Sequence, residues 1–175
     1  MKCLCFSDSH NFSYYMRKAL NLHKDAEAVF FLGDGLADIL ELSQYYPEMT
    51  FYAVKGNCDS SVLAASRQIP ETDSVTLLGK RIVFTHGDLY GAKYGTAGLF
   101  KLATDTYADI VLFGHTHECA EIYVPAEENS KGDEYSLKKP FYLFNPGSIG
   151  SSSASYGIIT LNEGGGVLFS NGNFT

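Results

Sequence analysis

The sequence has little positive charge, few cysteines and no apolar run of the roughly 20 residues that a membrane span needs. Its 13 Lys and Arg residues are outnumbered by 20 Asp and Glu residues, which gives a formal net charge of −7. This balance argues against a protein held to nucleic acid or anionic lipid by bulk electrostatics. The apolar stretch before Asp8 is too short for a signal peptide. We therefore expect a cytoplasmic protein with no membrane partner and no stable nucleic-acid complex.

The cysteines do not follow the spacing of a disulfide framework or of a paired C-x-x-C zinc site. They are Cys3, Cys5, Cys58 and Cys119. Reduced thiols are the expected state. Arginine is also scarce, and its three positions, Arg17, Arg67 and Arg81, lie outside every polar cluster described below.

The sequence does contain enough apolar material for a substantial core. Of its 175 residues, 45% are apolar, including 12 Phe and 12 Tyr. This composition excludes a disordered or fibrous chain, and the length is close to that of one folded unit. We predict a single domain over residues 1–175.

The order of apolar patterns predicts an α/β fold with two sheets. The first half alternates short apolar runs with helical spacing, which is typical of β-α-β units and a largely parallel sheet. The expected strands there are 3–7, 28–33 and 51–55, and the expected helices lie over 12–20 and 36–46. From residue 74 onward, runs joined by Gly-centred turns predict a second sheet, with strands at 74–78, 81–85, 110–114, 120–124, 141–144, 156–161 and 166–170 and a helix over 94–107. The polar stretch Ala126 to Lys139 is expected to be a solvated hairpin tip or loop.

Five short polar clusters interrupt the apolar strands, each where a strand is expected to end. Four of the five histidines lie in them, and His23, which is expected to face solvent, lies outside. Strand ends are where α/β folds place their sites. The clusters are Asp8-Ser9-His10, Gly33-Asp34, Gly56-Asn57-Cys58-Asp59, Thr85-His86-Gly87 and Gly114-His115-Thr116-His117.

Each cluster alone has an ordinary structural explanation. Asp-x-His is usually a turn or helix cap, Gly-Asp is often a helix start, and Gly-Asn is a common turn dipeptide. Residues two apart in an extended segment project to the same side, however, so Asp8 pairs with His10 and His115 with His117. With Asp34, Asn57 and His86, these pairs supply the imidazole and oxygen ligands that Mn, Fe, Ni or Zn accepts.

The ordered set, followed by Asn145-Pro146-Gly147-Ser148, resembles the calcineurin-like metallophosphoesterase superfamily, and most closely its small single-domain bacterial and archaeal phosphodiesterase branch. The resemblance implies a four-layer α/β/β/α sandwich of two mixed sheets flanked by helices, with the site at one edge of the sheets. It also implies two divalent ions, Mn²⁺ first and Ni²⁺, Fe²⁺ or Zn²⁺ as alternatives. The implied ligands are Asp8, His10 and His117 for one ion, Asn57, His86 and His115 for the other, and Asp34 for both.

This resemblance implies hydrolysis of a small phosphoester by in-line attack of a metal-bridging hydroxide. The expected catalytic residues are Asp34, Asn57, His86 and Asp59. Asp59 is expected either to orient a metal-bound histidine or water, or to be an ordinary turn carboxylate. Cys58 replaces a histidine of larger relatives, which favours diesters with good leaving groups, and we expect its thiol to be packed rather than nucleophilic.

Two other functional classes remain open. The retromer complex contains a subunit of this fold that acts mainly in protein binding, so this chain could be a non-catalytic scaffold. A nuclease or phosphomonoesterase of the same superfamily is the second alternative, although the acidic charge counts against a nuclease. A homo-oligomer is compatible with the sequence.

Overall fold

The computed structural model describes residues 1–126 and 139–174. The first sheet is built from β1 (Lys2–Phe6), β2 (Ala28–Phe31), β3 (Thr50–Ala53), β9 (Ala154–Leu161) and β10 (Val167–Phe174). The second is built from β4 (Thr72–Leu77), β5 (Lys80–Thr85), β6 (Ile110–Leu112), β7 (Cys119–Val124) and β8 (Phe141–Pro146). The helices are α1 (Tyr14–Leu22), α2 (Leu36–Leu42), α3 (Ser61–Ser66) and α4 (Ala97–Thr106), and short 3-10 helices are η1 (Ser43–Tyr45), η2 (Asp88–Tyr90) and η3 (Ala92–Tyr94).

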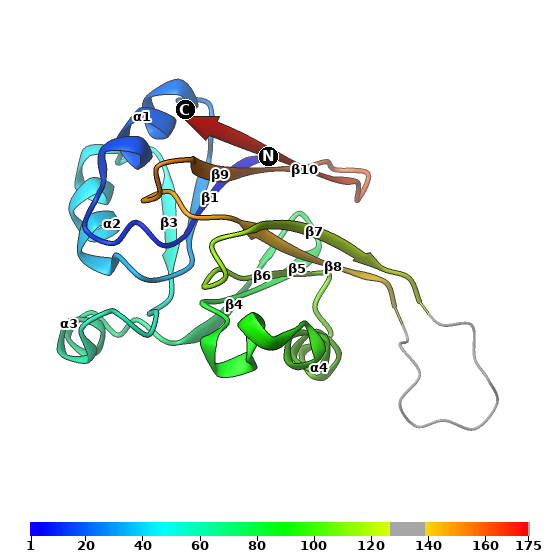
Figure 1. Ribbon diagram of the computed structural model, residues 1–175. Helices are drawn as coiled ribbons and strands as arrows, with labels where there is room; N and C mark the ends of the chain where they lie inside the picture. Colours follow the sequence, from blue (N-terminus) through cyan, green and yellow to red (C-terminus); the bar gives the residue numbers. More distant parts are fainter. Residues whose placement is uncertain (127–138, 175) are drawn as a thin grey trace.

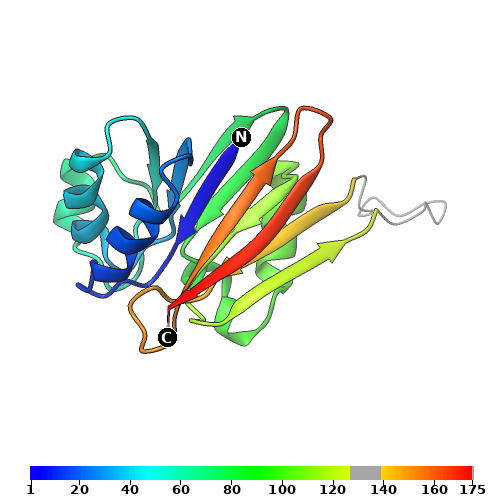
Figure 2. The ribbon, with the colours of Figure 1, turned by 90° about the horizontal axis from the view of Figure 1, so that it is seen from above.

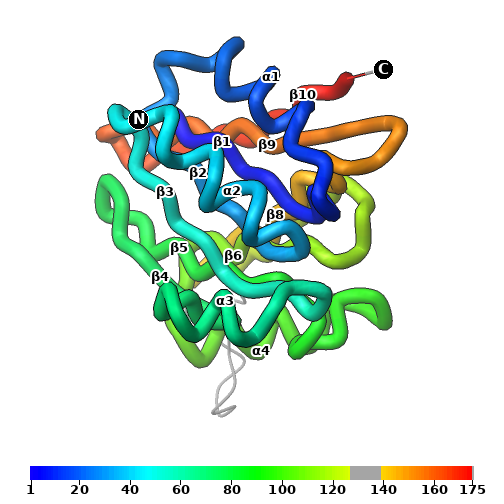
Figure 3. The backbone as a smooth tube through the Cα atoms, turned by 90° about the vertical axis from the view of Figure 1, so that its left-hand side faces the viewer, coloured from blue at the N-terminus to red at the C-terminus, as the bar shows by residue number. Residues whose placement is uncertain are grey.

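The two sheets pack face to face between outer helices (Figure 1). Their strand orders are β10-β9-β1-β2-β3 and β4-β5-β6-β8-β7. Figure 3 shows α1 and α2 outside the first sheet and α4 outside the second. This architecture confirms the predicted α/β class with two mixed sheets flanked by helices.

Strand alternation explains the layers, because successive side chains point to opposite faces. On β1, Leu4 packs with the buried residues of α1 and α2, whereas Cys5 faces the other sheet. Between the sheets, the buried rings of Phe30 and Phe84 meet edge to face with centroids 5.3 Å apart. Such a pair contributes roughly 0.5–1.5 kcal/mol beyond the burial of its area. A third apolar layer joins α4 to the outer face of the second sheet.

Parallel pairing brings the site loops to one edge. Phe6 pairs with Phe31, and Phe31 pairs with Ala53, so the carboxyl ends of β1, β2 and β3 lie side by side. In the second sheet, Phe84 of β5 is in register with Leu112 of β6. The loops that follow these strands therefore leave from neighbouring ends of the two packed sheets, as seen from above in Figure 2.

Several details differ from the predictions. The first sheet is mixed rather than largely parallel, because β9 and β10 pair antiparallel with their neighbours. Helix α4 begins at Ala97, three residues later than predicted, since η3 and Gly95 at φ 136° precede it. Helix α3 was not predicted, and its N-cap Ser60 accepts a hydrogen bond from the Leu63 N–H. The predicted polar loop over 126–139 lies almost wholly outside the described residues.

The helices were compared with the length and hydropathy that a membrane span needs. Within the part of the chain that the structure describes, none is both long and apolar enough to span a bilayer.

Candidate metal centre

The backbone is unusual at the predicted ligands. Five of the seven have φ in the left-handed region, namely Asp8 (58°), His10 (48°), Asp34 (59°), His115 (68°) and His117 (64°). Residues other than glycine rarely adopt this conformation, which costs on the order of 1–3 kcal/mol each and clusters at functional sites. The fold therefore bends the chain at these positions to hold particular side chains.

Asp8 lies two residues after the end of β1 and its side chain is fully buried. Its Oδ2 atom accepts hydrogen bonds from the Ser7 hydroxyl at 2.5 Å and from the His115 N–H at 3.1 Å. Its Oδ1 atom is the only buried side-chain nitrogen or oxygen among the described residues that has no hydrogen-bond partner. A buried carboxylate oxygen without a hydrogen-bond partner is costly, so this oxygen favours a positive group beside it.

Three imidazole nitrogens surround that oxygen. The Nε2 atoms of His117, His10 and His86 lie 3.2, 3.8 and 4.0 Å from Asp8 Oδ1. The Nε2 atoms of His10 and His117 are themselves only 3.2 Å apart. Converging imidazole nitrogens around an unsatisfied carboxylate oxygen are the donors that a divalent transition metal accepts.

His86 has one ring nitrogen fixed by the backbone. Its Nδ1 atom lies 2.8 Å from the Leu32 carbonyl oxygen and can only donate to it, which directs Nε2 into the site. That Nε2 lies 3.1 Å from Asn57 Oδ1, 3.1 Å from His115 Nδ1 and 3.3 Å from Asp34 Oδ2. These three atoms and Nε2 form a second group of candidate ligands.

The charges of this second group are strongly coupled. Burial alone would raise the pKa of Asp34, but the hydrogen bond and charge of His86 and the Cys58 N–H hold that pKa well below its ordinary value. Burial likewise opposes the charge on His86, yet Asp34 and Asp8 raise the pKa of His86. Asp34 is therefore an ionised carboxylate at neutral pH.

Asp34 lies within reach of both groups. Its carboxylate forms one candidate metal cluster with Asp8 and His86 and another with His10 and Cys58, and in each the ligand atoms lie within 4.8 Å of one another. The structure thus brings all seven predicted ligands to one place, with Asp34 between the two groups. Their role as ligands stays a prediction.

Two glycines beside Asp34, Gly33 and Gly56, leave no room for a larger side chain. A Cβ atom added at Gly56 would lie 2.2 Å from Asp34 Oδ1. One added at Gly33, whose φ is +95°, would lie 2.5 Å from the Gly56 nitrogen. These two glycines allow the second and third polar clusters to contact each other.

Asp59 acts on this loop through the backbone. Its carboxylate accepts hydrogen bonds from the N–H groups of Asp34, Gly35, Leu36 and Gly56, at 2.8 to 2.9 Å. None of its described bonds goes to a histidine, and a role in orienting a metal-bound histidine or water stays a prediction. We therefore treat Asp59 as a positioning residue for Asp34.

The Asn145–Ser148 segment contacts the backbone of the site. Asn145 donates to the Gly114 carbonyl and to the Thr116 hydroxyl, both at 3.0 Å. Ser148 donates to the Asp8 carbonyl at 2.9 Å. These bonds fix the backbone on either side of the first group.

Two sequence-based expectations are wrong. Cys58 is exposed, not packed, because its loop passes over the surface of the site. His23 is half-buried rather than solvent-facing. Its two ring nitrogens lie 2.9 Å from Lys2 Nζ and 2.9 Å from the Tyr156 hydroxyl, so it joins β1 to β9.

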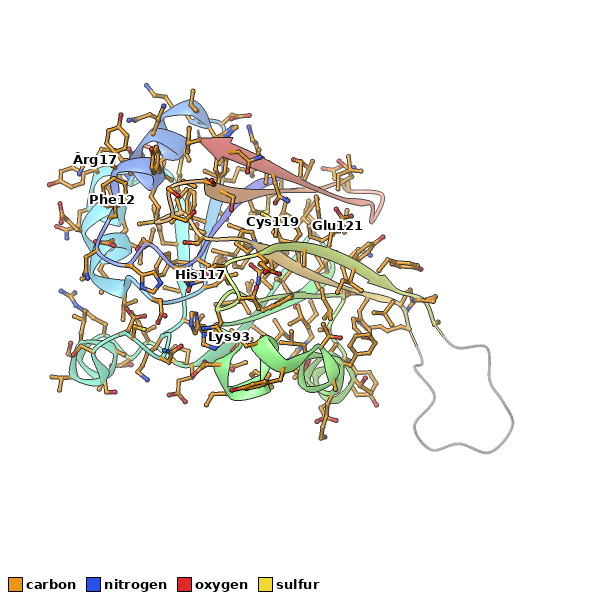
Figure 4. The ribbon with its side chains drawn as sticks, in the orientation of Figure 1. Phe12, Arg17, Lys93, His117, Cys119 and Glu121 are labelled. Atoms are coloured by element: carbon orange, nitrogen blue, oxygen red, sulfur yellow. The ribbon has the colours of Figure 1, made fainter. Side chains whose placement is uncertain are left out.

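One cation near the site was missed by the sequence analysis. Lys93, in η3, forms no ion pair or hydrogen bond within the described ranges, and its charge contributes, after burial and His86, to a lowered pKa of His115. Figure 4 labels Lys93 below His117 in the view. Lys93 is six residues from the nearest residue of a polar cluster, Gly87, so no local motif could have identified it.

The chain is similar in sequence to known metallophosphoesterases. A family model described as the calcineurin-like phosphoesterase superfamily domain matches residues 1–164. The probable metallophosphoesterase YsnB of Bacillus subtilis (strain 168) is 28% identical over 176 residues, covering 97% of this chain and 90% of YsnB.

Solved structures share the fold. A novel archaeal phosphodiesterase is 22% identical with a TM-score of 0.65, covering 98% of this chain and 99% of its own. Wild-type Vps29 from Entamoeba histolytica, crystallised with Zn²⁺, is 19% identical with a TM-score of 0.66, and all of both chains is covered. At these identities the likeness concerns the fold alone.

Proposed function

The chain belongs to the calcineurin-like phosphoesterase superfamily, and we propose that it is a two-metal phosphodiesterase that hydrolyses a small phosphoester. The observation that carries the proposal is the Oδ1 atom of Asp8, which is buried, has no hydrogen-bond partner and faces the Nε2 atoms of His10, His86 and His117. A cation at this position would satisfy an oxygen that nothing else in the site satisfies.

The donor chemistry fits two divalent ions. Asp8, His10 and His117 would hold one, and Asn57, His86 and His115 would hold the other, with the Asp34 carboxylate available to both. The set combines imidazole nitrogens with carboxylate and amide oxygens, which suits Mn²⁺, Fe²⁺, Ni²⁺ or Zn²⁺. We place Mn²⁺ first. When bound, such a pair would supply activated water, clamp the phosphoryl oxygens and outweigh the two carboxylate charges.

The residues of the chain have separate tasks in this proposal. The Leu32 carbonyl holds His86 in the tautomer that keeps Nε2 turned inward. Asp59 and the Cys58 N–H fix Asp34, the former through the loop and the latter by a 2.7 Å bond to Oδ1. The side chains of His10 and His117 are 39% and 45% exposed, so the first group opens to solvent and a substrate can enter there.

Diesters with good leaving groups are the proposed substrate class. A general acid would be needed to protonate a poor leaving group, and the position that carries a histidine in larger relatives is Cys58 here. The net charge of −7 disfavours long nucleic acids, so the substrate is small.

A non-catalytic protein-binding scaffold is the second candidate. It is favoured by the likeness to Vps29 and by exposed aromatic residues at the start of α1, where Phe12 is 47% and Tyr14 59% exposed. Metal binding alone does not separate the candidates, since one solved Vps29 carries Zn²⁺. Turnover does separate them.

The test combines metal content with hydrolysis of matched aryl phosphodiester and phosphomonoester substrates. Wild type is compared with Asp34→Asn, with His86→Ala and with the surface control Asp105→Asn on α4. We expect metal-dependent diester hydrolysis in wild type and control and its loss in the two site variants. Full activity in both site variants contradicts the two-metal proposal, and metal binding without turnover of either substrate favours the scaffold.

A further inference from the structure

We propose that Cys58 Sγ, together with His10 and Asp34, forms a binding site for thiophilic cations at the mouth of the metal centre, so that Cys58 raises the affinity for Zn²⁺ and Cd²⁺ relative to that for Mn²⁺. The inference rests on the proposed metal centre and adds one ligand to its seven candidate ligands. It assigns a function to a side chain that the proposed reaction leaves unused.

The three ligand atoms already lie close together. Sγ of Cys58, a carboxylate oxygen of Asp34 and a ring nitrogen of His10 are all within 4.8 Å of one another. Asp34 is buried, whereas Cys58 and His10 are exposed. The site therefore has one anchored ligand and two that an incoming cation can reach from solvent.

The loop holds the thiol in this place through its neighbours. The Cys58 N–H donates to Asp34 Oδ1 at 2.7 Å, which fixes the backbone directly beneath the side chain. The Asn57 amide nitrogen donates to Cys58 Sγ at 3.2 Å, while the Asn57 oxygen lies 3.1 Å from His86 Nε2. One amide thus connects the thiol to the second group of candidate ligands.

A second observation points independently to a cation. His10 belongs to this cluster and also to the one with Asp8 and His117, where the buried Asp8 Oδ1 lacks a partner. The unsatisfied oxygen lies 3.8 Å from His10 Nε2. The thiol therefore shares His10 with a site whose buried carboxylate oxygen has no hydrogen-bond partner.

The chemistry separates soft from hard cations. Thiolate favours Zn²⁺ and other thiophilic ions, whereas Mn²⁺ favours oxygen ligands. On binding, a sulfur–metal bond forms, the S–H bond breaks and the proton passes to solvent, so neither oxidant nor reductant is needed. Cys58 would thereby shift selectivity without entering the phosphoester reaction.

The other cysteines provide contrasts. Cys3 and Cys5 are buried between the sheets. Cys119 is exposed like Cys58, but its Sγ donates to the Pro146 carbonyl at 3.3 Å and it belongs to none of the metal clusters found among the described residues. Figure 4 shows Cys119 on β7, apart from His117. Cys119→Ser is therefore a matched control for Cys58→Ser.

The experiment uses Co²⁺ as a spectroscopic probe and Cd²⁺ and Mn²⁺ in binding titrations. In wild type and Cys119→Ser, we expect the near-ultraviolet thiolate-to-cobalt charge-transfer absorption. In Cys58→Ser we expect that absorption to be lost. The ratio of Cd²⁺ to Mn²⁺ affinity should fall by ~10-fold or more, because even residues that only orient a metal ligand contribute this much to metal affinity. An absorption absent from wild type, or retained in Cys58→Ser, overturns the proposal.

A measurement on unmodified protein covers the case in which Cys58→Ser misfolds. Alkylation of each cysteine, followed by mass spectrometry, should slow at Cys58 but not at Cys119 when Cd²⁺ is added, and equal rates with and without Cd²⁺ overturn the proposal. These readouts do not depend on turnover. A Co²⁺–thiolate absorption without hydrolysis under any metal would refute the proposed function alone.

Discussion

His86 Nε2 lies 3.3 Å from Asp34 Oδ2, although the two residues are 52 positions apart in the chain and come from different sheets. The opposite ring nitrogen is held by the Leu32 carbonyl at 2.8 Å, one residue after β2. The end of β2 therefore orients the His86 ring through the Leu32 carbonyl and carries Asp34 two residues later. A change at one of these residues should therefore alter the position of the others.

Replacing His86 by Ala should weaken metal binding, and a direct binding measurement tests this. The substitution removes a ligand and leaves Asp34 without its hydrogen-bonded partner. We expect metal affinity to fall by ~10–100-fold or more. Calorimetric titration with Mn²⁺ measures this, and an affinity equal to that of Asp105→Asn would contradict it.

Replacing Asp59 by Ala should disturb Asp34 without removing the side chain of a candidate ligand. Four backbone N–H groups lose their acceptor, and each buried unsatisfied donor costs about 1–3 kcal/mol. We expect a lower free energy of unfolding in urea together with weaker Mn²⁺ binding. Asp59→Asn retains one acceptor oxygen and should recover part of both losses, and no recovery at all would argue against a positioning role.

Gly56→Ala should be far more harmful than Gly164→Ala. The new methyl group at position 56 would lie 2.2 Å from Asp34 Oδ1, whereas at position 164 it would meet no atom within 4 Å. Overpacking of this kind costs about 1–3 kcal/mol and displaces side chains. Urea unfolding and metal titration on the two variants measure the difference, and equal behaviour would show that the loop can move aside.

Lys93 should assist the binding of anionic substrates. It is an exposed cation without an ion-pair partner in the described part of the chain, and it acts electrostatically on His115. Lys93→Gln should raise KM several-fold with kcat little changed, and added salt should reduce the difference because it screens exposed charges. Lys24→Gln, on the surface after α1, is the control. An unchanged KM at low salt would refute the assignment.

His23 should make the protein sensitive to mild acid. Burial, followed by the charge of Lys2, lowers the pKa of His23, so the folded state favours the neutral ring. As pH falls through roughly 6.5, the unfolded chain takes up a proton that the folded protein resists, and stability decreases. His23→Gln keeps an acceptor and a donor but cannot titrate. Between about pH 7.5 and 5.5 its midpoint in urea should therefore fall less than that of wild type.

The sequence by itself determined the fold class and the identity of the candidate ligands. Short apolar runs indicated most strands, because a strand buried on both faces, such as the one with Leu4 and Cys5, carries apolar residues at successive positions. The candidate ligands were readable because turns and helix caps explain each polar cluster alone better than they explain five such clusters in this order. Helix α3 and the start of α4 were not readable, since short segments take their conformation from tertiary contacts.

Only the tertiary structure decided which groups meet and in which direction they point. The exposure of Cys58, the backbone partners of Asp59, the buried network of His23 and the proximity of Lys93 all depend on contacts between segments distant in the chain. Local sequence fixes which atoms a residue carries. The packing of two sheets decides which of those atoms are shielded from water. Because the Asp8 Oδ1 atom is shielded and has no hydrogen-bond partner, a cation beside it would be stabilising.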